Sequence, residues 1–187
     1  MKKTIAIIGS LDTKGEEFKF LKDEIEKRGC DTFVINVGVL GKAPFFTEVS
    51  AEEVARAGGA ELSGLVERAD RGEAMAVMTR GVTDVVVRYY EEGKFDGIIS
   101  MGGGGGTAMG TSAMRALPVG IPKLMVSTVA SGDTSQYVGT SDIVMAPSIV
   151  DVAGLNRISR TVFGNAAGAI CGMVSGDVQS LEIIIIC

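Results

Sequence analysis

Short apolar runs alternate along this chain with longer segments in which apolar residues recur every three or four positions. The runs are continuous rather than alternately polar, which is typical of strands buried on both faces of a parallel sheet. The longer segments have the period of amphipathic helices, which cover such a sheet. The expected strands are residues 4–8, 32–37, 95–101, 123–128 and 143–146. The sequence therefore predicts a three-layer, doubly wound α/β fold with a mainly parallel sheet of five or six strands.

The connections between these strands predict their order. Right-handed crossovers favour the flavodoxin-like order 2-1-3-4-5, and Rossmann-like variants are the alternative. We expect a turn over residues 9–15, a helix over residues 107–117, and a capping box formed by Ser50 and Glu53. A break near Gly72 is expected to divide the helical stretch 61–90.

The chain is long enough for one ordinary hydrophobic core, and its length does not indicate a second core. We expect one α/β domain over residues 1–175. Residues 176–187 end in LEIIIIC. They are expected to form a tail, a sixth strand or the start of a second α/β unit.

Charge and composition disfavour or exclude several classes of function. The 18 basic and 23 acidic residues leave a net charge of −5, a sign that disfavours nucleic-acid binding. The chain has no histidine, which excludes Ser-His-Asp and Cys-His nucleophiles and zinc sites that need an imidazole. Its three cysteines are odd in number and lack C-x-x-C spacing, which fits a reducing compartment better than a disulfide framework. No stretch reaches the roughly 18 apolar residues of a membrane helix. We expect a cytoplasmic protein without a nucleic-acid or membrane partner.

A run of five glycines lies between the third expected strand and the helix that follows it. Consecutive glycine amides can approach an anion closely, and a helix N-terminus adds roughly half a positive charge. A tight turn alone rarely needs five glycines in a row, so we favour a phosphate site over a purely structural turn. The expected phosphate contacts are Gly102, Gly103, Gly104, Gly105, Gly106 and Thr107.

Known nucleotide fingerprints fit this run poorly. A G-x-G-x-x-A pattern occurs at Gly103, Gly105 and Ala108, but a glycine run matches such a pattern almost automatically. In a dinucleotide-binding fold, an acidic residue about 20 positions after the glycines hydrogen-bonds the ribose. This chain has no acidic residue there, and Lys123 lies near that position instead. The Walker lysine is also missing after Gly110. The sequence supports neither a dehydrogenase nor a P-loop ATPase.

The loop after the first strand supplies a carboxylate, a hydroxyl and an ammonium group. These belong to Asp12, Thr13 and Lys14. Lys14 can neutralise a phosphate, and Asp12 can hold a magnesium ion or a ribose hydroxyl. The alternative is an N-cap, in which Asp12 or Thr13 accepts bonds from helix amides and Lys14 is solvated. Capping and ligand binding are compatible.

The loop after the fourth strand is small and polar. Its hydroxyls and amides can bind the phosphates or the sugar of a nucleotide, and Asp133 is a second candidate for magnesium. Alone, the loop would be read as an ordinary turn. Its expected place beside the glycine run makes it a candidate. The residues are Ser127, Thr128, Ser131, Gly132 and Asp133.

Small residues recur on successive turns of the last expected helix. They are Gly164, Ala167, Gly168 and Gly172. Such spacing permits close packing of helices. It predicts either contact with the rest of this chain or the seam of a homodimer.

Several ordered motifs resemble those of a known family. The motifs GSLDTKGEE, MGGGGGT, STVASGD, APSIVDVAGLNRISR and NAAGAICGM resemble bacterial and fungal proteins related to the plant tobamovirus-resistance protein. The resemblance implies a Rossmann-like domain over residues 1–175 that binds ATP and forms a homodimer. It also implies that the three loops described above line the nucleotide site. Many relatives carry a serine within the glycine run, where this chain has only glycine.

We therefore expect an ATP-binding domain, with Mg²⁺ as a candidate companion ion and with no catalytic residue assigned. The first alternative is a phosphotransferase or ligase that acts with a second domain or a partner chain. In that case Asp12, Asp133 or Lys14 would move the proton or the phosphate. The second alternative is a homo-oligomeric interaction module with a structural nucleotide.

Overall fold

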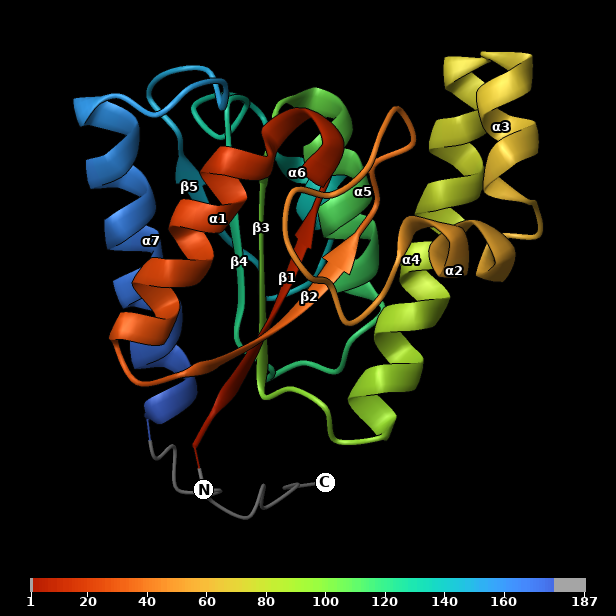
Figure 1. Cartoon of the computed structure of the whole chain (residues 1–187). Coiled ribbons are helices and arrows are strands. Elements are labelled where there is room, and N and C mark those ends of the chain that lie inside the picture. Colours follow the sequence, from red (N-terminus) through yellow and green to blue (C-terminus); the bar gives the residue numbers. More distant parts are fainter. Residues whose placement is uncertain (1, 177–187) are drawn as a thin grey trace.

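The computed structural model describes residues 2–176, and these residues contain a parallel sheet flanked by helices (Figure 1). Within them, five strands lie in the order β2-β1-β3-β4-β5, and every neighbouring pair is parallel. The strands are β1 (Thr4–Gly9), β2 (Asp31–Asn36), β3 (Gly97–Gly102), β4 (Lys123–Ser127) and β5 (Val144–Pro147). The predicted fold class and strand order are confirmed.

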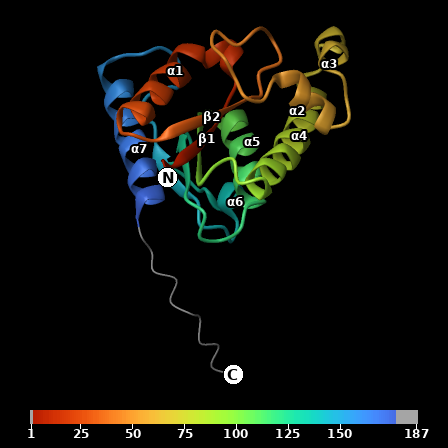
Figure 2. The same cartoon turned by 60° about the horizontal axis from the view of Figure 1, so that its bottom comes forward.

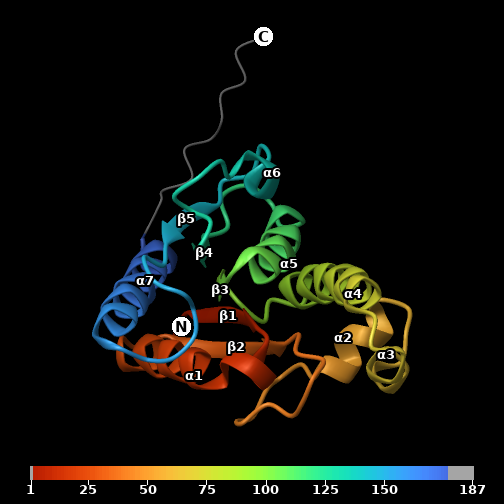
Figure 3. The same ribbon diagram turned by 90° about the horizontal axis from the view of Figure 1, so that it is seen from above.

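Helices cover both faces of the sheet (Figure 3). They are α1 (Leu11–Lys27), α2 (Ala51–Ala57), α3 (Leu62–Arg68), α4 (Arg71–Glu91), α5 (Gly104–Arg115), α6 (Ser135–Val138) and α7 (Arg157–Ser175). In β1, Ile5 and Ile7 pack against α1 and α7, whereas Ala6 and Ile8 pack toward α2, α4 and α5. This alternation follows from the two-residue period of a strand, and it explains why the central strand β1 is apolar on both faces.

The helix α1 begins earlier than expected. Its first turn starts at Leu11, within the expected turn 9–15, and it has one non-helical residue, Lys14 (φ −131°, ψ 29°). The amide of Leu11 donates to Asn36 Oδ1 at 3.3 Å, and the amide of Lys14 donates to the Ser10 carbonyl at 3.0 Å. Contacts with β2 thus support a helical turn that apolar periodicity alone does not indicate.

The glycine run is also partly helical. Helix α5 begins at Gly104, three residues before the expected start at Thr107. The prediction of a turn through all five glycines is wrong, because Gly104, Gly105 and Gly106 form the first helical turn.

The expected break near Gly72 lies slightly earlier, between α3 and α4. Ala69 adopts a left-handed conformation (φ 50°), and the Asp70 side chain accepts a hydrogen bond from the Glu73 amide at 3.0 Å. Asp70 therefore caps α4, and Gly72 lies inside its first turn. Only half of the predicted Ser50–Glu53 capping box is present: the Ser50 hydroxyl accepts from the Glu53 amide at 3.3 Å, whereas the Glu53 carboxylate accepts from Arg88 and Tyr89.

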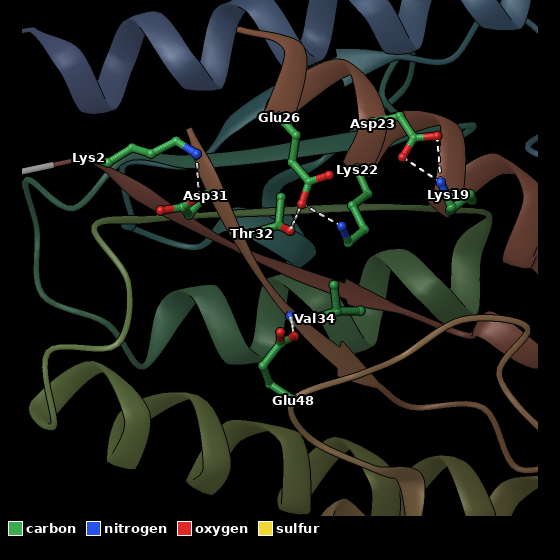
Figure 4. A network of polar contacts seen from close by, with 9 residues as sticks. All are labelled: Lys2, Lys19, Lys22, Asp23, Glu26, Asp31, Thr32, Val34 and Glu48. Carbon is green, nitrogen blue, oxygen red and sulfur yellow. Dashed lines mark hydrogen bonds and ion pairs between the residues drawn. The ribbon is translucent and has the colours of Figure 1, made fainter. Parts of the chain in front are cut away.

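The outer edge of β2 is covered by a following segment of chain. The Asn36 amide donates to Val49, and the Val49 amide donates to Val34, at 3.0 and 3.1 Å. The Glu48 carboxylate accepts from the Val34 amide at 2.6 Å (Figure 4). These bonds satisfy an edge that would otherwise be open to pairing with another chain.

Helix α7 packs beside α1 on one face of the sheet (Figure 2). A Cβ at Gly164 would lie 4.0 Å from Glu24 Oε2, and one at Gly168 would lie 3.5 Å from Arg28 Nε. Both glycines thus face α1 of the same chain, which supports the intrachain alternative for these two residues. Apart from Gly176, the predicted tail 176–187 lies outside the described residues. Among residues 2–176, no helix combines the length and hydropathy needed to cross a membrane.

Candidate functional site

Three neighbouring cavities lie at the carboxyl ends of the strands in the described part of the chain. The central cavity, about 80 Å³, is formed where β1 and β3 end. These strands are adjacent in the sheet, and the chain continues from them to opposite sides, so this is the topological switch point. Ligands of open α/β sheets bind at such points. Its polar and glycine lining consists of Gly9, Ser10, Thr13, Lys14, Ser100, Gly102, Gly103 and Gly106.

The glycine turn presents backbone amides at this position. Gly103 is the N-cap of α5, with extended backbone and no side-chain cap, and the Thr107 amide donates to its carbonyl at 2.8 Å. The amides of Gly104 to Gly106 precede that first bond and have no acceptor within the helix. A Cβ on Gly102 would lie 2.9 Å from the Cα of Gly106, so the turn depends on the close approach that glycine allows.

Thr107 and Ser127 are brought together in the interior. Both side chains are fully buried, and their hydroxyl oxygens lie 2.6 Å apart. Ser127 also accepts from the Val129 amide at 3.1 Å. These hydroxyls join the start of α5 to the end of β4, and Thr107 does not line the central cavity.

Asp12 fixes the connection between β2 and α2. Its Oδ2 accepts a hydrogen bond from the Leu40 amide at 2.6 Å. Its Oδ1 is buried and has no hydrogen-bond partner among residues 2–176. A Cβ on Gly38 would lie 2.3 Å from that oxygen, so the connection passes close to the carboxylate. Asp12 is not the N-cap of α1. Its carboxylate accepts from the Leu40 amide in another segment, and Ser10 occupies the N-cap position.

Lys14 and Glu17 fix the connection between β5 and α7. Lys14 Nζ donates to the Val152 carbonyl, and the Glu17 carboxylate accepts from the Gly154 amide. Glu17 is buried, although it is charged. Sequence reasoning placed Lys14 at the site but missed Glu17; the motif DTKGEE was the available signal. The first turns of α1 thus hold loops on both sides of the central cavity.

A second cavity, about 470 Å³, lies beside the central one and is mainly apolar. We name it the methionine cavity after Met75, Met78 and Met109. It shares Ser10, Thr13, Val37 and Met109 with the central cavity. Its other walls come from the β2–α2 connection, α3 and the start of α4, and Asp12 lies at its edge. Sequence reasoning assigned the methionines mainly to the core, because no local pattern indicates which of them border a cavity.

A third cavity, about 510 Å³, lies at the ends of β4 and β5. We name it the hydroxyl cavity; it is lined by Ser127, Thr128, Ser131 and Pro147 to Asp151. Gly132 and Asp133 line none of the three cavities in the described part of the chain. Asp133 instead accepts from the Ser135 amide at 2.9 Å, and that bond lowers the pKa of its carboxyl.

The predicted residues therefore share one edge of the sheet but divide between cavities. Asp12 and Thr13 border the methionine cavity, and Lys14 borders the central one. Gly104 and Gly105 belong to the glycine turn but line none of the three cavities described for residues 2–176. The sheet order and the position of the central cavity define a Rossmann-like, doubly wound α/β domain with a concave site at its switch point.

The chain belongs to the uncharacterised protein family UPF0261, whose N-terminal domain matches residues 3–179. It is 52% identical over 182 residues to a UPF0261 protein of Clostridium tetani, covering 97% of this chain and 45% of that protein. A UPF0261 protein of Mesorhizobium japonicum is 45% identical over 175 residues, covering 92% and 43%. The ToMV resistance protein Tm-1(GCR237) of Solanum lycopersicum is 37% identical over 190 residues, covering 92% and 25%. The chain thus spans less than half the length of these curated relatives, and the expected family relationship is confirmed.

Proposed function

We propose that this domain binds ATP, with the phosphates at the glycine turn and the base in the methionine cavity. The observation that carries the proposal is the junction of two unlike cavities at the switch point. One is small and bordered by glycine amides, and the other is larger and apolar. A nucleotide has the same division between its charged and its aromatic ends.

The phosphate end is supported by charge as well as by shape. The first-turn amides of α5 carry the positive end of the helix dipole, and they have no helical acceptor. Lys14 adds a full positive charge at the border of the central cavity. Thr128 is the residue of the β4–α6 loop beside this end, since its Oγ1 lies 3.7 Å from the Cβ position of Gly103.

The base end is supported by the volume and chemistry of the methionine cavity. Its 470 Å³ lies within the range of small-molecule sites, roughly 300–1,000 Å³. Methionine side chains contact aromatic rings favourably and adapt to their outline. Ser10 and Thr13 border both cavities, so they lie where the sugar joins the base to the phosphates.

Mg²⁺ is part of this proposal through Asp12. Protein sites for this ion use one or two carboxylates together with the substrate's phosphates. Asp12 is the candidate carboxylate because its Oδ1 has no partner within the described residues and because it adjoins Thr13, which borders both cavities, although Asp12 itself borders only the methionine cavity. Asp133 fits less well, because its carboxylate accepts from the Ser135 amide and it lines none of the three cavities in the described chain. When bound, Mg²⁺ would neutralise phosphate charge.

Isothermal titration with ATP, AMP and adenosine tests the proposal. We expect ATP to bind more tightly than AMP, and AMP more tightly than adenosine, because each phosphate adds contacts to the amides. Equal and negligible heats for ATP and AMP would refute the proposal. Tight binding of adenosine without any gain from phosphate would refute the role of the glycine turn.

A further inference from the structure

The hydroxyl cavity has polar groups that the fold itself does not use. The hydroxyls of Thr128 and Ser131 and the carboxylate of Asp151 belong to exposed residues and have no hydrogen-bond or ion-pair partner among residues 2–176, so a ligand can bind them in place of solvent. By contrast, the buried Ser127 and Ser148 hydroxyls both bond within the chain. The three groups without a protein partner line the same cavity, which has a volume of about 510 Å³.

A strained turn forms one wall of this cavity. Ile149 has a φ of 66°, and the Val150 amide donates to the Ser148 carbonyl at 2.7 Å. This is a γ-turn of the rare positive-φ kind, and a β-branched residue is disfavoured there. The Ile149 side chain is 71% exposed, so its burial does not account for the strained backbone conformation. Backbone strain of this kind concentrates at binding sites.

The surrounding structure holds the strained turn in place. The Ser148 amide donates to the Ser127 carbonyl at 3.0 Å, and the Ser148 hydroxyl donates to the Val150 carbonyl at 2.6 Å. Lys14 binds the carbonyl of the buried Val152 just beyond it. The wall is therefore anchored on both sides before any ligand arrives, which lowers the entropy lost on binding.

The charge of the hydroxyl cavity differs from that of the glycine turn. No lysine or arginine is among its lining residues in the described chain, and Asp151 contributes a negative charge. An anion is disfavoured here, whereas a hydroxyl or an ammonium group can donate to Asp151 and exchange hydrogen bonds with Thr128 and Ser131. Pro147, Ile149 and Val150 supply apolar contact for a short carbon skeleton.

We propose that the hydroxyl cavity is a second binding site, separate from the nucleotide site, for a small molecule that carries amine and hydroxyl groups. Asp151 binds the amine, and Thr128 and Ser131 bind the hydroxyl. Because Thr128 also lies beside Gly103, the second ligand and the phosphate end of the nucleotide are neighbours.

Methyl NMR of the whole chain tests this proposal with ethanolamine as the probe and acetate as the anionic control. We expect ethanolamine to shift the Ile149 and Val150 methyl signals and acetate to leave them unchanged. Asp151→Asn should weaken the ethanolamine effect about tenfold or more, the loss expected for one charged hydrogen bond. Asp133→Asn is the matched control, because that residue lines none of the described cavities; it should titrate like the parent chain.

Repeating the titration with ATP present separates the two sites. The proposal predicts that ethanolamine still shifts Ile149 and Val150 when ATP has shifted the methyl signals of Met75 and Met109. If ATP abolishes the ethanolamine shifts by occupying the same cavity, the second site is refuted while nucleotide binding stands. Absence of shifts at Ile149 and Val150, or an unchanged response in Asp151→Asn, also refutes it. Should ATP itself fail to bind, the ethanolamine result still decides this proposal.

Discussion

Lys14 Nζ donates a hydrogen bond to the backbone carbonyl of Val152, which joins the start of α1 to the loop that leads into α7. The same lysine borders the central cavity. One side chain therefore supports the wall of the hydroxyl cavity and places positive charge where phosphate is proposed to bind. This dual position means that a change at Lys14 affects stability as well as binding.

Replacing Lys14 by methionine should lower both stability and ATP affinity. The variant keeps the apolar stem but leaves the Val152 carbonyl without its donor, which costs about 1–2 kcal/mol of unfolding free energy. Lys19→Met is the control, because Lys19 is exposed and only pairs with Asp23 at 2.6 Å; a change below about 0.5 kcal/mol is expected. Urea unfolding measures the stability of both variants, and isothermal titration measures their affinity for ATP. Equal stability of the two variants would show that the Lys14 contact has no structural role.

Replacing Lys123 by methionine should destabilise the fold strongly. Its side chain is fully buried, and Nζ donates to Asp142 and to the Pro118 carbonyl at 2.7 Å and to the Ile121 carbonyl at 3.0 Å. Removing the buried ammonium leaves the Pro118 and Ile121 carbonyls without their donor and Asp142 without its ion pair, and we expect a loss of about 3 kcal/mol. Calorimetric or urea unfolding measures it. A loss below that of Lys14→Met would contradict this account of the buried Lys123 ammonium.

The same pair predicts a dependence of stability on pH. Partial burial acts to raise the pKa of Asp142, but hydrogen bonds from Lys123 and the Gly120 amide hold it below its ordinary value. The folded state therefore binds this proton less readily than the unfolded state. Its contribution is present above the unfolded value, about 3.9, and is lost as pH falls through the lower folded pKa. Unfolding free energies between about pH 5 and pH 3 should fall less steeply in Lys123→Met than in the parent chain; parallel curves would contradict the assignment.

Cys171 should be unreactive in the native protein. Burial and its hydrogen bond with Cys30 raise the pKa of the Cys171 thiol to about 12. At pH 8 very little of the thiol is therefore in the reactive thiolate form. In a Cys187→Ser background, Cys171 of the native protein should react with iodoacetamide far more slowly than Cys171 of protein unfolded in urea. Mass spectrometry measures the rate, and equal rates would contradict the buried environment of Cys171.

Much of the fold was predictable because the central strands β1, β3 and β4 are buried on both faces. Continuous apolar runs gave strand positions within a few residues; the run 32–37, for example, corresponds to Asp31–Asn36. A break in the helical stretch was predicted near Gly72, but its exact position at Ala69 was not predictable, since alanine has no preference for a left-handed backbone and tertiary packing determines it. Gly72, which had suggested a break, is accommodated within the helix.

The site was predictable in location but less so in detail. Parallel strands end at one edge, so loops following β1, β3 and β4 had to meet there. Sequence did not indicate that Thr107 turns inward to Ser127, nor that α3 and α4 add an apolar cavity. Both features depend on contacts between distant segments, which local patterns do not encode. The strained turn at Ile149 is likewise visible only in the folded backbone.

The most direct test of the glycine turn as a phosphate site compares Gly104→Asp with Gly104→Ala. A Cβ on Gly104 would meet no atom within 4 Å, so both variants should fold, and an acid in the first turn also favours the helix dipole. A carboxylate there repels phosphate, so isothermal titration should show ATP binding to Gly104→Asp about tenfold or more weaker than to Gly104→Ala. The alanine variant should bind like the parent chain. Equal ATP affinities in the two variants would contradict phosphate binding at this turn.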